Sequence, residues 1–495
     1  MTRAHRHADA AKSVRREPRV VIVGAGMAGI AAAHALQEAD FTNFVILEKG
    51  SDVGGVWHWN RYPGLRCDVP SHMYQFAFAP NPNWTHFWAP GAEIQRYHRD
   101  VVDQLQLQPH LKLGCEVTSA EFKDNRWRIE TGTGERFDAD FLISATGVLH
   151  HPFIPVISGL DSFAGPIVHT ARWQDIDTVG KRLAVIGTGS TGVQVFSALQ
   201  PEAAHISHFT RTPQWVMWMP MTLPQPRIVR RALSAVPGLE WIVDWIQRIG
   251  TDLAVDLVIR PTWRRRMAQA YARTCLRVLV RDRALRAALT PDYQPFCKRQ
   301  VMSGDYYRAI ARPNARLVSE PIAKVTPAGI ETADGVHHDV DAIILATGFE
   351  AHNYMRPMAL RGRDGLSIDD AWAKGPRAWA MTAIPGFPNL FTILGPNSPS
   401  GSMSLQLVAE TTARYITGWL QRFRDGDITT VEVTEEATSR FVDDVAEAMG
   451  PTVWTTGCNS WYFADDNHID LWPFDRKRMT ALLTVHRDND FIITR

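Results

Sequence analysis

The stretch Arg19-Val-Val-Ile-Val23, followed by Gly24-Ala-Gly26-Met-Ala-Gly29, decides the fold of the first part of this 495-residue chain. Its β-branched residues predict a short buried strand, and the apolar run that continues to Leu36 predicts a helix. The glycine spacing between them is typical of a tight turn whose backbone approaches a pyrophosphate while the helix N-terminus faces the negative charge. The segment therefore predicts a Rossmann-like dinucleotide-binding fold.

The same pattern occurs a second time. Arg182-Leu-Ala-Val-Ile186 is followed by Gly187-Thr-Gly189-Ser190-Thr191-Gly192 and then by an apolar helical run from Val193 to Leu199. One glycine motif alone is weak, but two copies, each placed between a strand and a helix, predict two dinucleotide-binding units in one chain. We expect the turn from Gly187 to Gly192 to contact the second dinucleotide.

The residue that ends the next strand distinguishes the two copies. In the first copy, Phe44-Val-Ile-Leu47 ends in Glu48, and a carboxylate there accepts hydrogen bonds from ribose hydroxyls and repels a 2′-phosphate. In the second copy, His208-Phe-Thr210 ends in Arg211-Thr212, and a guanidinium beside a hydroxyl suits a 2′-phosphate. The first copy is therefore expected to hold the adenosine of FAD, and the second copy to hold NADPH.

Two further strands suggest how the chain is divided into domains. Phe141-Leu-Ile-Ser144 and Ala342-Ile-Ile-Leu345 each run into Ala-Thr-Gly, and we expect them to mark where the chain leaves the first dinucleotide domain and re-enters it. The predicted fold is α/β, with a discontinuous FAD domain (19–150 and 342–495) and an inserted NADPH domain (151–341). Residues 1–18 are basic and polar, and they predict a disordered tail.

An arginine-rich stretch at about 226–286 predicts a helical insertion within the NADPH domain. Its positive charge suits a surface near NADPH or an anionic membrane, although a solvated helical face explains the arginines equally well.

Composition excludes several classes of protein. The net charge of +1 gives no overall field toward nucleic acid, and no uncharged run is long enough to span a membrane. The five cysteines are scattered, and no two form a C-x-x-C pair. We therefore expect no disulfide framework, no zinc or other metal site and no dithiol redox centre, which fits a reducing cytoplasm. The oligomeric state is not indicated.

Two segments carry a family resemblance. Gly54-Gly55-Val-Trp57-His-Trp59-Asn-Arg61-Tyr62-Pro63-Gly64-Leu-Arg66-Cys67-Asp68 resembles a fingerprint of Baeyer–Villiger monooxygenases at each of its fixed positions. Phe163-Ala-Gly165-Pro-Ile-Val-His169-Thr-Ala-Arg172-Trp173-Gln174 resembles their second fingerprint, with a departure at Gln174, where the family has Pro or Asp. Trp173 is typical of this family, because heteroatom-oxidising flavin monooxygenases usually carry a smaller aromatic residue there. A structural, domain-coupling role is implied for His169 and Trp173.

Two later segments complete the resemblance. Cys297-Lys298-Arg299 resembles the family's catalytic arginine segment, and Cys458-Asn-Ser-Trp461-Tyr462 resembles part of its C-terminal block. The resemblance implies that Arg299 supplies a fixed positive charge at the reacting oxygen and that Asp68 pairs with it. Lys298 is expected beside Arg211 at the phosphate, with a solvated lysine as the alternative. Gly55, Trp57 and Trp461 are expected to contact a cofactor, although core packing also accounts for Trp57.

The resemblance implies a specific chemistry. The protein would be an FAD-dependent, NADPH-consuming monooxygenase that converts a small apolar or aromatic ketone to an ester or lactone with O2, through a C4a-peroxyflavin. Asp68-Val-Pro-Ser-His72, without a Gly-Ala-Asn-x-Pro-Gly-Lys sequence near the C-terminus, is more similar to the 4-hydroxyacetophenone-type branch than to the cyclohexanone-type branch. A flavin-containing N- or S-oxygenase and a flavin redox protein without oxygenation chemistry are the alternatives.

Overall fold

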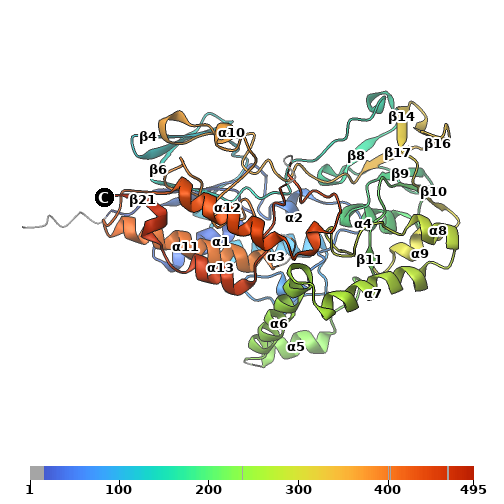
Figure 1. The fold of residues 1–495 in the computed structure, drawn as a ribbon, viewed down its shortest axis with the longest axis horizontal. Coiled ribbons are helices and arrows are strands. Elements are labelled where there is room, and N and C mark those ends of the chain that lie inside the picture. The colour runs from blue at the N-terminus through green and yellow to red at the C-terminus, as the bar shows by residue number, and fades with distance from the viewer. Residues whose placement is uncertain (1–15, 237, 400, 402, 465–467) are drawn as a thin grey trace, which may run out of the picture.

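Two parallel five-stranded sheets organise the molecule, and they lie side by side (Figure 1). The computed structural model describes residues 16–495 except 237, 400, 402 and 465–467. The first sheet, in strand order, is β19 (Leu390–Thr392), β7 (Phe141–Ser144), β1 (Val20–Val23), β2 (Phe44–Leu47) and β3 (Leu111–Lys112). The second is β13 (Ala315–Val318), β10 (His205–Phe209), β9 (Arg182–Ile186), β17 (Ala342–Leu345) and β8 (Ile167–His169).

Each sheet contains one of the two predicted glycine turns. The first turn joins β1 to α1 (Met27–Glu38), and the second joins β9 to α4 (Ser190–Leu199). Gly24 and Gly187 have φ of +104° and +115°, which side chains rarely adopt. A Cβ at Gly29 would lie 1.9 Å from the Gly24 carbonyl oxygen, and a Cβ at Gly192 would lie 2.0 Å from that of Gly187. The first and third glycines of each turn are thus required by the protein's own packing, as the motif predicts.

The position of β17 corrects the predicted domain boundary. The strand pairs with β9 and β8 of the second sheet, with Ala342 opposite Leu183, so the chain has not returned to the first sheet at residue 342. β7 occupies the equivalent place beside β1, with Phe141 opposite Val20. The two Ala-Thr-Gly strands are therefore corresponding members of an internal repeat rather than an exit and a re-entry. The chain returns through β18 (Ala359–Arg361) and β19.

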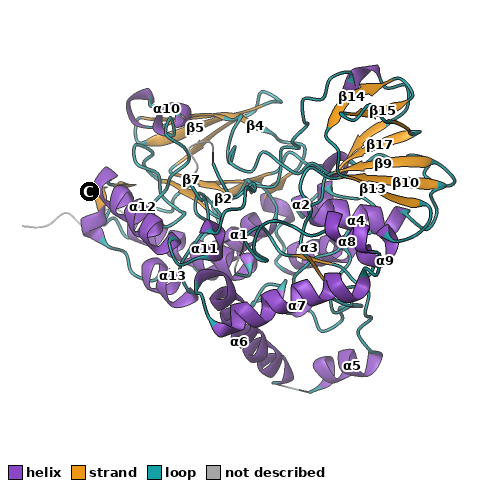
Figure 2. Cartoon of the chain, turned by 45° about the vertical axis from the view of Figure 1, so that its right-hand side comes forward, coloured by secondary structure: helices purple, strands orange, loops and turns teal. Residues whose placement is uncertain are grey.

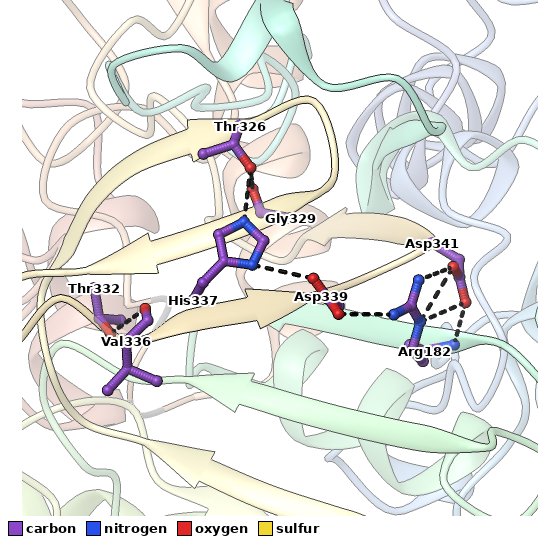
Figure 3. Close-up of polar contacts among 8 residues, drawn as sticks. All are labelled: Arg182, Thr326, Gly329, Thr332, Val336, His337, Asp339 and Asp341. Carbon is purple, nitrogen blue, oxygen red and sulfur yellow. Dashed lines mark hydrogen bonds and ion pairs between the residues drawn. The ribbon is translucent and has the colours of Figure 1, made fainter.

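The repeat extends to a charged residue before each of these strands. Figure 3 shows Arg182, at the start of β9, joined to Asp341, which precedes β17; the guanidinium Nη2 lies 2.7 Å from Oδ1, and the backbone N–H donates to Oδ2. In the first sheet, the Arg19 N–H donates to Oδ2 of Asp140, which precedes β7. Each aspartate fixes the register between the glycine-turn strand and its Ala-Thr-Gly neighbour.

Smaller elements surround the sheets (Figure 2). The stretch predicted as a helical insertion is helical, and it consists of α5 (Arg227–Ala235), α6 (Leu239–Ile259), α7 (Trp263–Leu279) and α8 (Arg283–Ala288). The long C-terminal helix α11 (Leu405–Arg424) packs against α1. The remaining helices are α2 (Val56–Trp59), α3 (Gly91–Gln104), α9 (Tyr306–Ile310), α10 (Ile368–Ala371), α12 (Glu435–Met449) and α13 (Arg476–Leu483). The remaining strands are β4 (Val117–Lys123), β5 (Arg126–Thr131), β6 (Arg136–Ala139), β11 (Val216–Met217), β12 (Val301–Met302), β14 (Ile322–Thr326), β15 (Gly329–Thr332), β16 (His337–Asp339), β20 (Thr430–Val433) and β21 (Phe491–Thr494).

The N-terminal tail was predicted to extend to residue 18, and this is too long. Residues 1–15 lie outside the described part of the chain. Arg16 is held in place, because its guanidinium lies 2.7 Å from Asp140 and its N–H donates to the carbonyl of Arg424. Within the described residues, no helix has both the length and the apolar character needed to cross a membrane.

Candidate active site

An ion pair connects the two parts of the chain that the sequence singled out. Nε of Arg299 donates to Oδ2 of Asp68 at 2.9 Å, and Nη2 donates to Oδ1 at 2.8 Å, a bidentate arrangement. Asp68 belongs to the first fingerprint, whereas Arg299 follows the helical insertion, 231 residues later. The Arg299 side chain is 36% exposed, so the protein's own packing does not cover it completely.

The surroundings of this pair keep the arginine charged. The carboxylate of Asp68 raises the pKa of Arg299 further above its ordinary range. Tyr462 lies beside the guanidinium, and burial raises its pKa to about 12, so its hydroxyl stays protonated at neutral pH. Burial likewise raises the pKa of the Cys67 thiol, next to Asp68. The site therefore holds a permanent cation beside a carboxylate, and burial keeps the nearby Tyr462 hydroxyl and Cys67 thiol protonated.

A disulfide bond joins Cys297 to Cys458, and it corrects the expectation that the cysteines stay unpaired. Cys67, Cys115 and Cys275 are free and buried. The two bonded cysteines are 161 positions apart, and only folding brings them together, so spacing gave no sign of the pair. The bond fixes the segment that carries Arg299 to the C-terminal block that carries Tyr462.

Reduction of this disulfide is expected to destabilise the protein. Closing a loop of this length in the unfolded chain contributes up to about 5 kcal/mol in a chain-entropy estimate. Dithiothreitol should therefore lower the thermal unfolding midpoint of the wild-type protein by several degrees, as followed by differential scanning fluorimetry. The double variant Cys297→Ala/Cys458→Ala should unfold at the lower midpoint and not respond to dithiothreitol. An equal effect of the reductant on both proteins would contradict the expectation.

The first fingerprint packs on the helix that follows the second glycine turn. The hydroxyl of Tyr62 donates to Oε1 of Gln194 in α4 at 3.0 Å, and Nε2 of Gln194 donates to the carbonyl of Arg66. Gly64 has φ of +82°, and a Cβ there would lie 2.8 Å from the Gln194 carbonyl oxygen. The Pro-Gly step of the fingerprint thus permits close contact between the two dinucleotide-binding folds.

A cavity of about 350 Å³ lies at the first glycine turn. Four predicted residues line it: Gly24, Gly26, Glu48 and Gly55. Glu48 is buried, and its two carboxylate oxygens accept hydrogen bonds from the N–H groups of Ala25 and Gly50, at 2.7 and 2.6 Å. Since a carboxylate oxygen accepts more than one hydrogen bond, Glu48 both shapes the turn and retains capacity for a ribose hydroxyl.

The central glycine of this turn is open in a way that fits a bound dinucleotide. Gly26 has an ordinary backbone conformation, and a Cβ there would meet its nearest atom, the Cα of Gly55, at 3.4 Å. The protein's own packing therefore does not require glycine at position 26. Instead, the two glycine backbones leave a cradle on the cavity wall that a side chain would fill.

The second turn has the same open centre and gathers groups that bind anions. A Cβ at Gly189 would meet no atom within 4 Å, and the buried hydroxyl of Ser190 has no hydrogen-bond partner among the described residues. Arg211 is exposed, and Lys298 is half-buried with its Nζ 4.6 Å from the Tyr293 ring centre. Burial and the neighbouring charge of Arg211 lower the pKa of Lys298. Two cations thus lie close together near the turn.

Other residues that were predicted to contact a cofactor make contacts within the protein itself. Nε1 of Trp57 donates to the hydroxyl of Tyr74, and Trp59 rather than Trp57 lines the cavity. Thr191 lies 3.4 Å from the hydroxyl of Tyr62, and the carbonyl of Thr212 accepts a hydrogen bond from the Thr188 hydroxyl. Trp461 packs against the ring of Tyr462.

The second fingerprint fixes a turn between the sheets. His169 ends β8, and its Nδ1 accepts a hydrogen bond from the N–H of Ala171, which caps the turn that follows. That turn places the guanidinium of Arg172 4.6 Å from the ring centre of Trp59, a cation–π contact between the two fingerprints. Trp173 packs against the core, whereas Gln174 is exposed.

Several contacting residues escaped the sequence analysis. Tyr74 and Gln194 contact predicted residues that are distant in sequence, and no motif marks them. Arg172 lies within the second fingerprint, but its contact with Trp59 was not predicted. Tyr462 was part of a recognised block, and its place beside the arginine depends on the chain path. Among the described residues, no cluster of His, Cys, Asp or Glu has the arrangement of a metal site.

Comparisons with known proteins identify relatives of the whole chain. A family profile described as pyridine nucleotide-disulphide oxidoreductase matches residues 21–233. The chain is 37% identical over 480 residues to a Baeyer-Villiger monooxygenase from Streptomyces coelicolor, with 93% of this chain and 90% of that protein covered. It is 46% identical over 485 residues to an uncharacterized monooxygenase from Mycobacterium tuberculosis, with 97% of each covered.

A solved structure extends the likeness to the whole fold. Cyclohexanone monooxygenase from Rhodococcus sp. Phi1 bound to NADP+ superimposes with a TM-score of 0.87 at 29% sequence identity, covering 96% of this chain and 99% of that chain. The fold, the site and these relatives define a monooxygenase with two dinucleotide-binding folds. The chain belongs to the Baeyer–Villiger monooxygenase family.

Proposed function

We propose that this protein uses FAD and NADPH to convert a small apolar or aromatic ketone to an ester or lactone, with one oxygen atom of O2 entering next to the carbonyl carbon. The observation that carries the proposal is the bidentate Arg299–Asp68 pair, which holds a permanent cation against the first fingerprint. A general flavin redox protein has no need for such a charge.

The two cofactors are assigned by the groups that each turn presents. FAD would lie in the cavity at the first turn, with Gly26 and Gly55 against its pyrophosphate and Glu48 on its ribose. NADPH would lie at the second turn, where Ser190 has an unused hydroxyl and Arg211, Thr212 and Lys298 face the 2′-phosphate. Reduced FAD supplies the activation of O2 when it is bound.

The residues of this chain would then do three things. Arg299 holds a full positive charge against negative charge that develops on oxygen, without a proton that can be lost at neutral pH. Asp68 orients the guanidinium through two hydrogen bonds and reduces its net field. The surrounding packing, including buried Tyr462 and Cys67, limits access of water and stray protons to the site.

Product analysis tests this function directly. Purified protein would be incubated with NADPH, O2 and a panel of ketones and thioethers, with mass spectrometry of the products and parallel measurement of NADPH consumption. Esters or lactones are the expected products. Sulfoxides without esters would indicate a heteroatom oxygenase, and NADPH consumption without any oxygenated product would indicate a redox protein; either result would overturn the proposal.

The same panel addresses the branch of the family. We propose the 4-hydroxyacetophenone-type branch, supported by Asp68-Val-Pro-Ser-His72 and by the lack of the longer C-terminal motif. The superimposed solved structure is a cyclohexanone monooxygenase, so cyclohexanone serves as the reference substrate in this test. Faster turnover of aryl ketones than of cyclohexanone is expected, and the reverse order would contradict the branch assignment.

Arg211→Ala is expected to weaken NADPH binding selectively. Loss of one charged, bidentate contact with the 2′-phosphate typically removes roughly 1.5–3 kcal/mol, or about 10- to 150-fold in affinity. NADH lacks this phosphate, so its affinity should hardly change, and it serves as the internal control. Isothermal titration calorimetry, with each nucleotide in its reduced or oxidised form, would measure the two affinities. An equal loss for NADH and NADPH would show that Arg211 does not recognise the 2′-phosphate.

A further inference from the structure

The helical insertion exposes much of the apolar surface of this protein. Nearly half of the large apolar side chains that are exposed in the described part of the chain lie in this insertion, between Ile228 and Val278. Single exposed apolar residues are ordinary, but a concentration of them on one part of a surface marks a site of contact. Figure 1 shows α5 and α6 projecting away from both sheets.

Helix α7 carries these residues as a stripe. Trp263, Met267 and Val278 are 61, 63 and 64% exposed, and Tyr271 lies on the same side. With 3.6 residues per turn, positions 263, 267, 271 and 278 share one face of the helix. The opposite face, which includes Ala272, Cys275 and Leu276, is buried against the core. Helix α6 exposes a second stripe at the same periodicity, formed by Ile242, Trp245, Ile246, Ile249 and Leu253.

Arginines border the α7 stripe on one side. Arg266, Arg273 and Arg277 follow each other at helical spacing and are exposed. Arg273 and Arg277, together with Arg283 and Arg286 of α8, line a cavity of about 610 Å³ whose lining contains one carboxylate, Asp292. Among the described residues, no carboxylate lies within ion-pairing distance of Arg266, Arg277 or Arg283. An apolar stripe thus adjoins a hollow with excess positive charge.

We propose that this face, formed by the α6 and α7 stripes and the arginine-lined cavity, binds the surface of an anionic lipid bilayer. The apolar stripes would enter the boundary between headgroups and acyl chains, and lipid phosphates would fill the cavity. Trp245 and Trp263 suit that boundary, where tryptophan is enriched. The proposed contact is with the bilayer surface, and no helix among the described residues is long and apolar enough to span a membrane.

Charge favours lipid over a second copy of the chain. A two-fold dimer would place the same face opposite itself, and its unpaired arginines would then repel one another. Anionic headgroups instead offer the opposite charge over an extended area. A negatively charged bilayer therefore matches both the apolar and the cationic residues, which a second copy of this face does not.

Vesicle flotation tests the proposal with the full-length protein. The probes are phosphatidylcholine vesicles with and without phosphatidylglycerol, at low and high salt. Wild-type protein should float with phosphatidylglycerol vesicles at low salt and lose most of that binding at high salt or on pure phosphatidylcholine. Trp263→Ser/Met267→Ser and Arg277→Gln/Arg283→Gln should each reduce binding about tenfold or more. All four positions are outside the catalytic and nucleotide-binding residues, so NADPH oxidation without vesicles should be unchanged.

A matched control lies outside the helical insertion, near the C-terminus. Val485→Ser/Ile492→Ser removes two similarly exposed apolar side chains near the C-terminus, 56 and 48% exposed, and should leave flotation unaltered. The proposal would be overturned if the wild-type protein did not float with phosphatidylglycerol vesicles at low salt. It would also be overturned if Trp263→Ser/Met267→Ser or Arg277→Gln/Arg283→Gln bound these vesicles as well as the wild-type protein does. Sedimentation velocity separates the remaining case, because conversion of a dimer to a monomer by Trp263→Ser/Met267→Ser would assign the face to a second copy.

Discussion

Replacing Arg299 with alanine is expected to abolish ester formation while leaving reduction of the flavin by NADPH largely intact. Hydride transfer between stacked rings builds little localised charge near this side chain. The oxygenation step builds negative charge on oxygen, and loss of one preorganised positive group in a site shielded from water typically lowers the rate about 100- to 1,000-fold. The two half-reactions should therefore respond very differently to one substitution.

Three measurements separate these half-reactions. Anaerobic bleaching of the flavin by NADPH should proceed at near wild-type rate in Arg299→Ala, while gas chromatography should detect no ester and a peroxidase assay should detect H2O2. Arg299→Lys should restore little, because one ammonium cannot reproduce the bidentate contact with Asp68. Arg308→Ala, at an exposed arginine of α9, is the matched control and should retain ester formation. Ester production by Arg299→Ala at near wild-type rate would show that the arginine has only a structural role.

Gly26→Val is expected to yield a colourless protein without FAD, whereas the wild-type protein should be yellow as purified. The branched side chain would occupy the cradle between Gly26 and Gly55, where the backbone must approach the pyrophosphate. Because position 26 has an ordinary φ and its nearest contact is 3.4 Å away, the apoprotein should still fold. Flavin absorbance per mole of protein measures the loss, and circular dichroism checks the fold.

The second glycine turn offers a matched control. Gly189 has the same ordinary φ and an open surrounding, so Gly189→Val introduces the same side chain at the equivalent place of the repeat. It should retain FAD and lose NADPH binding. Normal FAD content in Gly26→Val, or loss of FAD in both variants, would contradict the assignment of one cofactor to each turn.

Local sequence determined the parts of this protein that depend on short-range geometry. The two glycine turns were predicted with their strands and helices, because a left-handed φ at Gly24 and Gly187 and the tight packing of Gly29 and Gly192 restrict those positions to glycine. The helical insertion and the family followed from composition and from fingerprints. Each of these signals lies within a few residues of the structure that it predicts.

Tertiary structure decided what depends on residues far apart in the chain. β17 carries the same Ala-Thr-Gly ending as β7, so its sequence was unable to say which sheet it joins; the pairing with β9 and the Asp341–Arg182 contact place it in the second. The Cys297–Cys458 bond likewise depends on the path of 161 intervening residues.

The same distinction applies to the candidate site. Sequence named Arg299 and Asp68 by resemblance, but their bidentate geometry and the neighbouring Tyr462 depend on how three remote segments meet. The exposure of the α7 stripe was likewise not predictable from the sequence, since apolar residues at helical spacing most often face a core. Which side of a helix is covered is set by the packing of the whole chain, because burial depends on neighbours that local sequence does not specify.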